Sequence, residues 1–154
     1  MMQGKRRVLF AVACFAVGVA LGVLGTLIHG NIWVLGDVGS GLVLPWGAVF
    51  ALVLVFAALV WAGTTSGSLA EVLLLGGTVF TVVTAVYLWP GPDQLMVHYS
   101  PQVWESLPGP VIASVVWWLG SAAVTILAMF AVRVVLITDD VKRRRAQAQF
   151  ALEQ

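Results

Sequence analysis

The side chains best suited to catalysis or metal binding gather in one polar stretch, residues 90–110, and His29 and Asp37 occur in an earlier one. Carboxylates and imidazoles are the usual groups for acid–base chemistry and for binding metals. No motif fixes their geometry, however, and isolated polar residues beside an apolar segment are usually just solvated. The sequence therefore predicts no catalytic, cofactor-binding or metal-binding residue. The four candidates in the later stretch are Asp93, His98, Tyr99 and Glu105.

Other reaction classes require residues that this chain lacks. Cys14 is the only cysteine, which excludes an internal disulfide and a thiol pair for disulfide exchange within the chain. A proton-coupled small multidrug transporter needs a carboxylate deep in the membrane, whereas Glu71 and the other acidic residues lie in predicted loops or at helix ends. No nucleophile is recognisably paired with a base. We therefore expect that the protein is not an enzyme and carries no cofactor.

The composition indicates that the solvent of this chain is a lipid bilayer. Hydrophobic residues make up 60% of its 154 residues and charged residues only 10%, too few to coat a soluble core of this size. Four stretches match the roughly 20 apolar residues that a membrane-spanning helix needs. We predict an all-α membrane protein, a single domain with four helices in an up-down bundle. The expected spans are residues 8–28, 42–61, 69–89 and 111–137, followed by a basic tail at 138–154.

The basic residues predict how the bundle is oriented. Lys5, Arg6 and Arg7 precede the first span, and no Lys or Arg follows until Arg133. Basic flanks remain in the cytoplasm, and an even number of spans places both termini there. We expect a multi-pass protein of the cell membrane. A basic start before an apolar run also suits a cleaved signal peptide, but the length of the run favours a retained helix.

The basic residues at the inner membrane surface are candidates for binding lipid headgroups. Arg133 lies about one turn inside its span, where a long side chain can extend to a phosphate, although an intramembrane charge can also mark a functional site. The tail can continue as a helix, because Asp139 and Asp140 are spaced to pair with arginines one turn later. Membrane lipids are the expected partners, a cytoplasmic protein being the alternative for the tail, and nucleic acid is not expected. The other headgroup candidates are Lys142, Arg143, Arg144 and Arg145.

Small and hydroxylated residues suggest which helix faces meet. Gly18, Gly22 and Gly25 follow one another at three- and four-residue steps, which permits close approach of another helix, in this chain or in another one. Hydroxyl residues also share faces of the third and fourth spans, where they can bond between helices or to their own helix. Those positions are Thr81, Thr84, Ser114, Ser121 and Thr125.

The long outer segment, residues 90–110, contains five prolines and cannot form one continuous helix. Ser100 before Pro101 suits an N-cap and first turn, so Pro101 to Leu107 forms either a short helix at the membrane surface or a simple loop.

Two functional hypotheses remain. The first is a structural or accessory membrane protein that packs in a larger membrane assembly or a homo-oligomer. The alternative is a small channel or transporter, with the hydroxyl faces lining a path for a neutral or weakly polar solute.

The residues Leu44-Pro45-Trp46-Gly47 and the spans rich in Ala, Val and Leu resemble small four-helix membrane proteins of actinobacteria. The resemblance covers the four spans but not the tail. It implies no activity, because none is assigned to such families.

Overall fold

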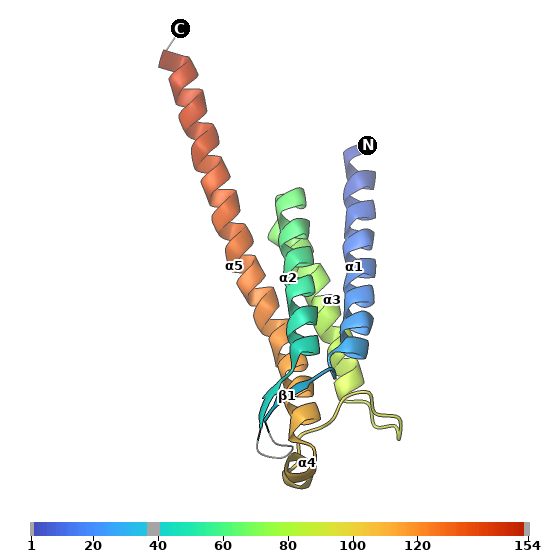
Figure 1. Cartoon of the computed structure of the whole chain (residues 1–154). Helices are drawn as coiled ribbons and strands as arrows, with labels where there is room; N and C mark the ends of the chain where they lie inside the picture. The colour runs from blue at the N-terminus through green and yellow to red at the C-terminus, as the bar shows by residue number, and fades with distance from the viewer. Residues whose placement is uncertain (1, 37–40, 153–154) are drawn as a thin grey trace.

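The computed structural model describes residues 2–36 and 41–152 and is mostly helical (Figure 1). Four helices are long and apolar enough to cross a membrane, as predicted, which supports a multi-pass membrane protein. They are α1 (Met2–Ile28), α2 (Trp46–Ser66), α3 (Leu69–Tyr87) and α5 (Pro108–Leu152). The remaining elements are β1 (Trp33–Leu35), β2 (Leu42–Leu44) and the short helix α4 (Pro101–Ser106).

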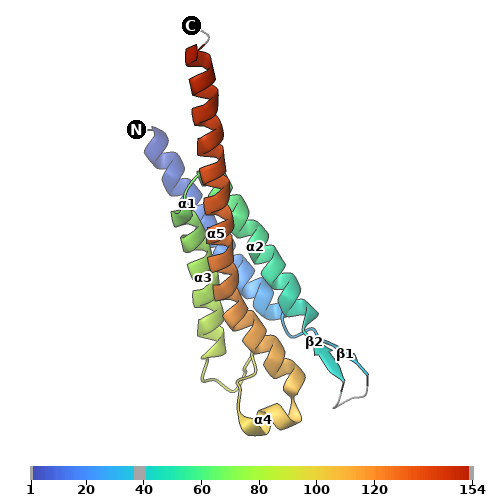
Figure 2. The ribbon, with the colours of Figure 1, turned by 90° about the vertical axis from the view of Figure 1, so that its left-hand side faces the viewer.

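Both chain ends lie at one end of the bundle in Figures 1 and 2, and α4 and the strands lie at the other. We call these the inner and the outer end, as names for the two ends of the bundle. Helix α3 packs on α1, α2 and α5, and α2 packs on α5. Apolar side chains fill the space between the helices, and the largest fully buried ones include Val55, Leu59, Leu75, Val79 and Trp117.

The turn between α2 and α3 follows from its small and polar residues. Gly67 adopts a left-handed conformation, with φ 67°, and its N–H donates to the Gly63 carbonyl at 2.9 Å. Ser68 then caps α3, because its hydroxyl accepts a hydrogen bond from the Ala70 N–H. The chain thereby reverses direction between α2 and α3 at the inner end with few connecting residues.

The predicted start of the second span at residue 42 is wrong. Helix α2 begins at Trp46, directly after Pro45, and Leu44 belongs to a strand. A proline disfavours helical backbone at the residue before it, so the helix cannot extend back through Leu44. The three residues before Pro45 form instead one strand of a hairpin, within a region for which no strand was predicted.

The hairpin joins α1 to α2. Trp33 pairs with Leu44, Val34 with Val43 and Leu35 with Leu42, in antiparallel register. Aromatic and β-branched residues favour strands, and Gly36, with φ 106°, begins the turn in a conformation that suits glycine. The outer end therefore carries a small sheet on an otherwise helical protein.

Helix α5 continues well beyond the predicted span and includes most of the tail. It runs as one helix to Leu152, and Figures 1 and 2 show it extending past the inner ends of the other helices. No Gly or Pro interrupts the sequence after Pro110 except Gly120, so nothing in the tail favours a break.

Helix α4 confirms the short helix rather than the loop in the outer segment. The Ser100 hydroxyl accepts the Val103 N–H at 3.2 Å, and Pro101 occupies the first turn. The helix ends at Ser106, one residue before the predicted limit.

Candidate functional site

A buried chain of hydrogen bonds connects three segments at the outer end. The Val97 N–H, in the outer loop, donates to the Ser114 hydroxyl of α5 at 2.9 Å. Ser114 lies 3.3 Å from Nε2 of His29, and Nδ1 of His29 lies 2.5 Å from the Thr26 carbonyl. An imidazole with its proton on Nδ1 satisfies every contact, because Nδ1 then donates to Thr26 and Nε2 accepts from Ser114. This outer network joins α1, α5 and the loop.

A serine beside a histidine is also the start of a nucleophilic site, and sequence reasoning missed this pair. Ser114 is 1% exposed and His29 is 4% exposed, and the Ser114 oxygen already accepts the Val97 N–H. This packing holds the loop on the bundle and covers the hydroxyl that would attack a substrate. The arrangement is therefore structural: it attaches the outer loop to α5 and to the end of α1.

We expect the outer network to weaken in mild acid. Burial lowers the pKa of His29 below its ordinary value of 6.5, against the opposing effect of the bond to Thr26. The unfolded chain then binds more protons just below pH 6.5, so the free energy of unfolding falls as the pH drops through that window.

Thermal unfolding in mild detergent between about pH 5 and about pH 8 measures this effect. The His29→Gln variant should lose this part of the pH dependence, and His98→Gln should keep it. A wild-type transition temperature that stays constant over the range would contradict the prediction.

The candidate residues of the outer segment do not assemble into an acid–base or metal site. His98 lies against the ring of Tyr87, with centroids 4.7 Å apart, and Tyr87 stacks on Trp118 at 4.5 Å. Within residues 2–36 and 41–152, no three His, Cys, Asp or Glu side chains come together as a metal site requires. Asp37 lies outside the described residues. The aromatic stack instead joins the outer loop to α3 and α5.

The predicted glycine stripe of α1 faces helices of the same chain. A Cβ added at Gly18 would lie 2.9 Å from the Leu75 carbonyl oxygen, and one at Gly22 would lie 2.9 Å from Val82. Gly25 lies against the ring of Trp117, whose Nε1 donates to the Thr26 hydroxyl at 3.1 Å. Gly18 and Gly22 thus face α3, and Gly25 faces α5.

The hydroxyl residues divide between the two predicted kinds of bond. Thr81, Ser121 and Thr125 donate to carbonyls of their own helices, at 2.7, 2.7 and 2.8 Å. Thr84 links two helices, because it accepts the Trp118 Nε1–H at 3.0 Å. Ser114 belongs to the outer network. These five side chains therefore have their polar atoms engaged within the protein.

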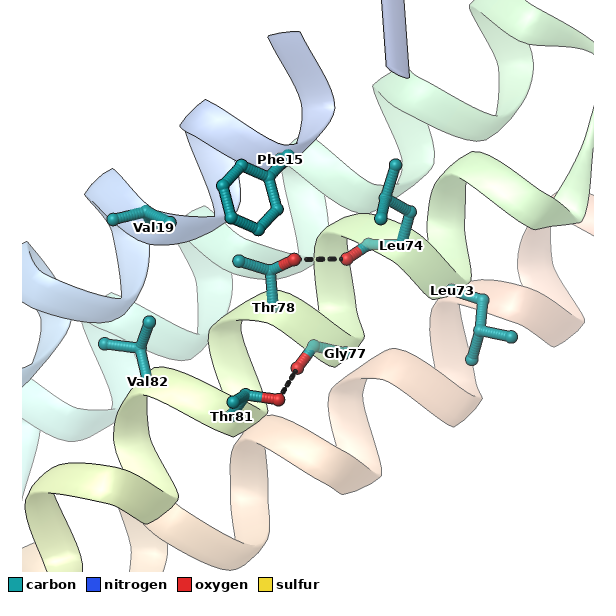
Figure 3. Close-up of a pocket in the computed structure, with 8 residues that line it drawn as sticks. All are labelled: Phe15, Val19, Leu73, Leu74, Gly77, Thr78, Thr81 and Val82. Carbon is teal, nitrogen blue, oxygen red and sulfur yellow. Dashed lines mark hydrogen bonds between the residues drawn. The ribbon is translucent and has the colours of Figure 1, made fainter. Parts of the chain in front are cut away.

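A groove of about 380 Å³ runs between α1 and α3 on the surface of the bundle (Figure 3). Thr78 and Thr81 donate to the Leu74 and Gly77 carbonyls, so neither hydroxyl hydrogen is free in the groove. Apart from the two neighbouring residues and the nearby backbone of α3 itself, no heavy atom of the described residues lies within 4 Å of a Cβ built on Gly77. The groove is an apolar, concave helix face, lined by Phe15, Val19, Leu73, Leu74, Gly77, Thr78, Thr81 and Val82.

The basic residues of α5 occupy two levels at the inner end. Arg133 is exposed. The preceding residue, Val132, packs against Gly63, which lies one turn before the end of α2, so Arg133 is at the level of the last turn of α2. Arg143 lines a polar cavity of about 430 Å³ with the α2–α3 turn, Asp139 and Asp140. Successive helical residues are about 100° apart, so the exposed side chains 142–145 point to all sides of α5. They form a basic collar rather than a one-sided stripe.

Comparisons with protein-family models, with curated proteins and with solved structures find no match to this chain. The likeness to actinobacterial membrane proteins therefore stays a prediction, and the functional argument rests on the geometry described above.

Proposed function

We propose that this protein is a non-catalytic, structural or accessory component of a larger membrane assembly. The observation that carries the proposal is the groove between α1 and α3, an apolar hollow that residues 2–36 and 41–152 leave open at the surface. Lipid gives helices no hydrophobic reason to associate, so association depends on close packing and small residues. The groove offers both, with Gly77 and Thr81 one turn apart in its lining. A helix of another subunit is the occupant that suits it.

The engagement of the hydroxyl groups supports an accessory role over transport by a single copy. A path for a polar solute needs groups that can replace its hydration. Ser121 and Thr125 instead bond carbonyls of α5, and fully buried Leu59, Leu75 and Val79 fill the space between the helices. A conduit for solute is therefore the less favoured function.

The proposal includes an orientation, with both termini in the cytoplasm and the protein in the cell membrane. It is supported by Lys5, Arg6 and Arg7 at one end of the chain and by the basic collar at the other, both at the inner end of the bundle. A collar around the helix can contact phosphates on every side, while Arg133, nine residues before Lys142 and so about 13 Å deeper, extends its long side chain toward the same surface.

Filling the groove tests the proposed function. Gly77→Leu places a bulky side chain where space is open, so the protein should fold while its partner is displaced. We expect wild-type protein to co-purify with a stoichiometric membrane partner after gentle solubilisation, and Gly77→Leu to lose that partner. Ala57→Leu, on the exposed surface of α2, is the matched control and should retain it.

Two results would contradict the proposal. One is a Gly77→Leu variant that keeps the same partner in the same amount. The other is a wild-type monomer that has no partner and conducts a neutral solute across reconstituted vesicles.

A further inference from the structure

The hairpin has two apolar faces with different surroundings. Cross-strand partners project to the same face of an antiparallel pair, so Val34 and Val43 share one face. These two valines line a cavity of about 250 Å³ together with Leu107 and Gly109, where α4 leads into α5. This face is therefore turned toward the bundle, where Val43 is partly buried and Val34 remains 43% exposed.

The opposite face carries large apolar side chains that are exposed in the part of the chain that the structure describes. Trp33 is 60% exposed, Leu35 58%, Leu42 70% and Leu44 39%. We call these four side chains the hairpin face. Figure 2 shows the strands projecting outward beyond the outer end of α2. A two-stranded hairpin is only marginally stable in water, and such a patch would be poorly solvated there.

The hairpin face continues the surface that α2 presents to lipid. The rings of Trp33 and Trp46 lie 5.7 Å apart, and Trp46 is the first residue of α2. Val49, Phe50 and Val53 are exposed along the next turns of that helix. Helix α2 is long and apolar enough to span a membrane. Since the rings of Trp33 and Trp46 are in contact, the lipid that surrounds α2 is also expected to reach the hairpin face.

The backbone sets the depth of the hairpin. Each strand of a two-stranded sheet has an outer edge with unpaired N–H and C=O groups, which cannot remain unsatisfied in hydrocarbon. The hairpin must therefore lie where water and headgroups reach its edges. Tryptophan favours that layer as well.

We propose that the hairpin face is a membrane-contact surface that rests on the upper acyl chains of the leaflet at the outer end. The hairpin itself lies in the headgroup layer beside the bundle. Its ligand is lipid, rather than a second copy of the chain, because the surface is continuous with the lipid-facing side of α2. The inference depends on the membrane spans and stands apart from the proposed accessory role.

Environment-sensitive labels on single cysteines test this placement. In a Cys14→Ala background, Leu42→Cys places a label on the hairpin face, and Pro92→Cys places one on the exposed outer loop as control. The full chain is reconstituted in phosphatidylcholine vesicles at low protein density. Quenching is then compared between aqueous iodide and lipids with a nitroxide near the top or the end of the acyl chain.

We expect the label at Leu42→Cys to be quenched several-fold more by the shallow nitroxide than by the deep one, and to be shielded from iodide. The label at Pro92→Cys should show strong iodide quenching instead. Leu35→Cys repeats the measurement, so the test does not depend on one variant folding.

Equal access of iodide to Leu42→Cys, Leu35→Cys and Pro92→Cys would overturn the proposal, since the hairpin face would then be in water. Stronger quenching by the deep nitroxide would overturn the depth. Loss of lipid quenching as protein density rises would show that a second copy covers the face. None of these results depends on whether Gly77→Leu releases a partner.

Discussion

Replacing Gly47 by alanine is expected to destabilise the protein by about 3 kcal/mol, because overpacking against groups that cannot move is costly. Gly47 lies in the first turn of α2, where an added Cβ would meet the Ile28 carbonyl at the end of α1. The Gly47 N–H also donates to the Asn31 carbonyl at 3.1 Å. The obstacle is backbone, so relief requires the outer ends of α1 and α2 to separate.

Gly77→Ala is the matched control for this substitution. Its new methyl group enters open space in a helix interior, where exchanging glycine for alanine stabilises by roughly 0.5–1 kcal/mol. Unfolding in mild detergent with increasing sodium dodecyl sulfate compares the two variants. Equal stability of Gly47→Ala and wild type would show that the ends of α1 and α2 are not in close contact.

Truncating Trp117 to alanine is expected to cost about 3 kcal/mol or more, since removal of a buried aromatic ring leaves a cavity. Trp117 is fully buried, lies against Gly25 and donates to Thr26. The loss in a bilayer is one of packing, because the surrounding helices cannot collapse fully onto the space.

Two variants separate the contributions at this position. Trp117→Phe keeps much of the ring contact, so it should lower the free energy of unfolding less than Trp117→Ala does. The destabilisation that Trp117→Phe still causes reflects the smaller ring and the lost hydrogen bond to Thr26. Trp89→Ala removes an exposed ring at the outer boundary and should change the unfolding midpoint little. If Trp117→Ala and Trp89→Ala unfold alike, the ring of Trp117 does not hold α1 on α5.

The four spans could be predicted from the sequence because the requirement for roughly 20 apolar residues acts on each segment alone. The start of α2 and the hairpin could not, because hydropathy does not distinguish an apolar strand from the first turn of a helix. Pro45 was the available signal: it disfavours helix at Leu44, yet a proline is also tolerated in a first helical turn. The tail helix was foreseeable from the spacing of Asp139 and Arg143.

The candidate sites were predictable only where neighbours in sequence act together. Gly18 and Gly22 are four residues apart, so their shared face follows from helix geometry alone. His29 and Ser114 are 85 residues apart, and their contact depends on how the bundle brings the end of α1 close to the start of α5. A hint lay in their positions, since each is a polar residue at the outer end of a span. The groove at Gly77 was unpredictable, because it depends on which face of α3 is left without a neighbour.

Helix α5 is uninterrupted and about 68 Å long, at about 1.5 Å per residue. Ser114 and Trp117 fix the rotation of the outer part of α5 about its axis. Because the helix is continuous, the same rotation fixes the direction in which the side chains of the basic collar point. One residue inserted between Ile137 and Lys142 would turn everything beyond it by about 100°. The angular position of the C-terminal segment thus depends on contacts made at the opposite end of the bundle.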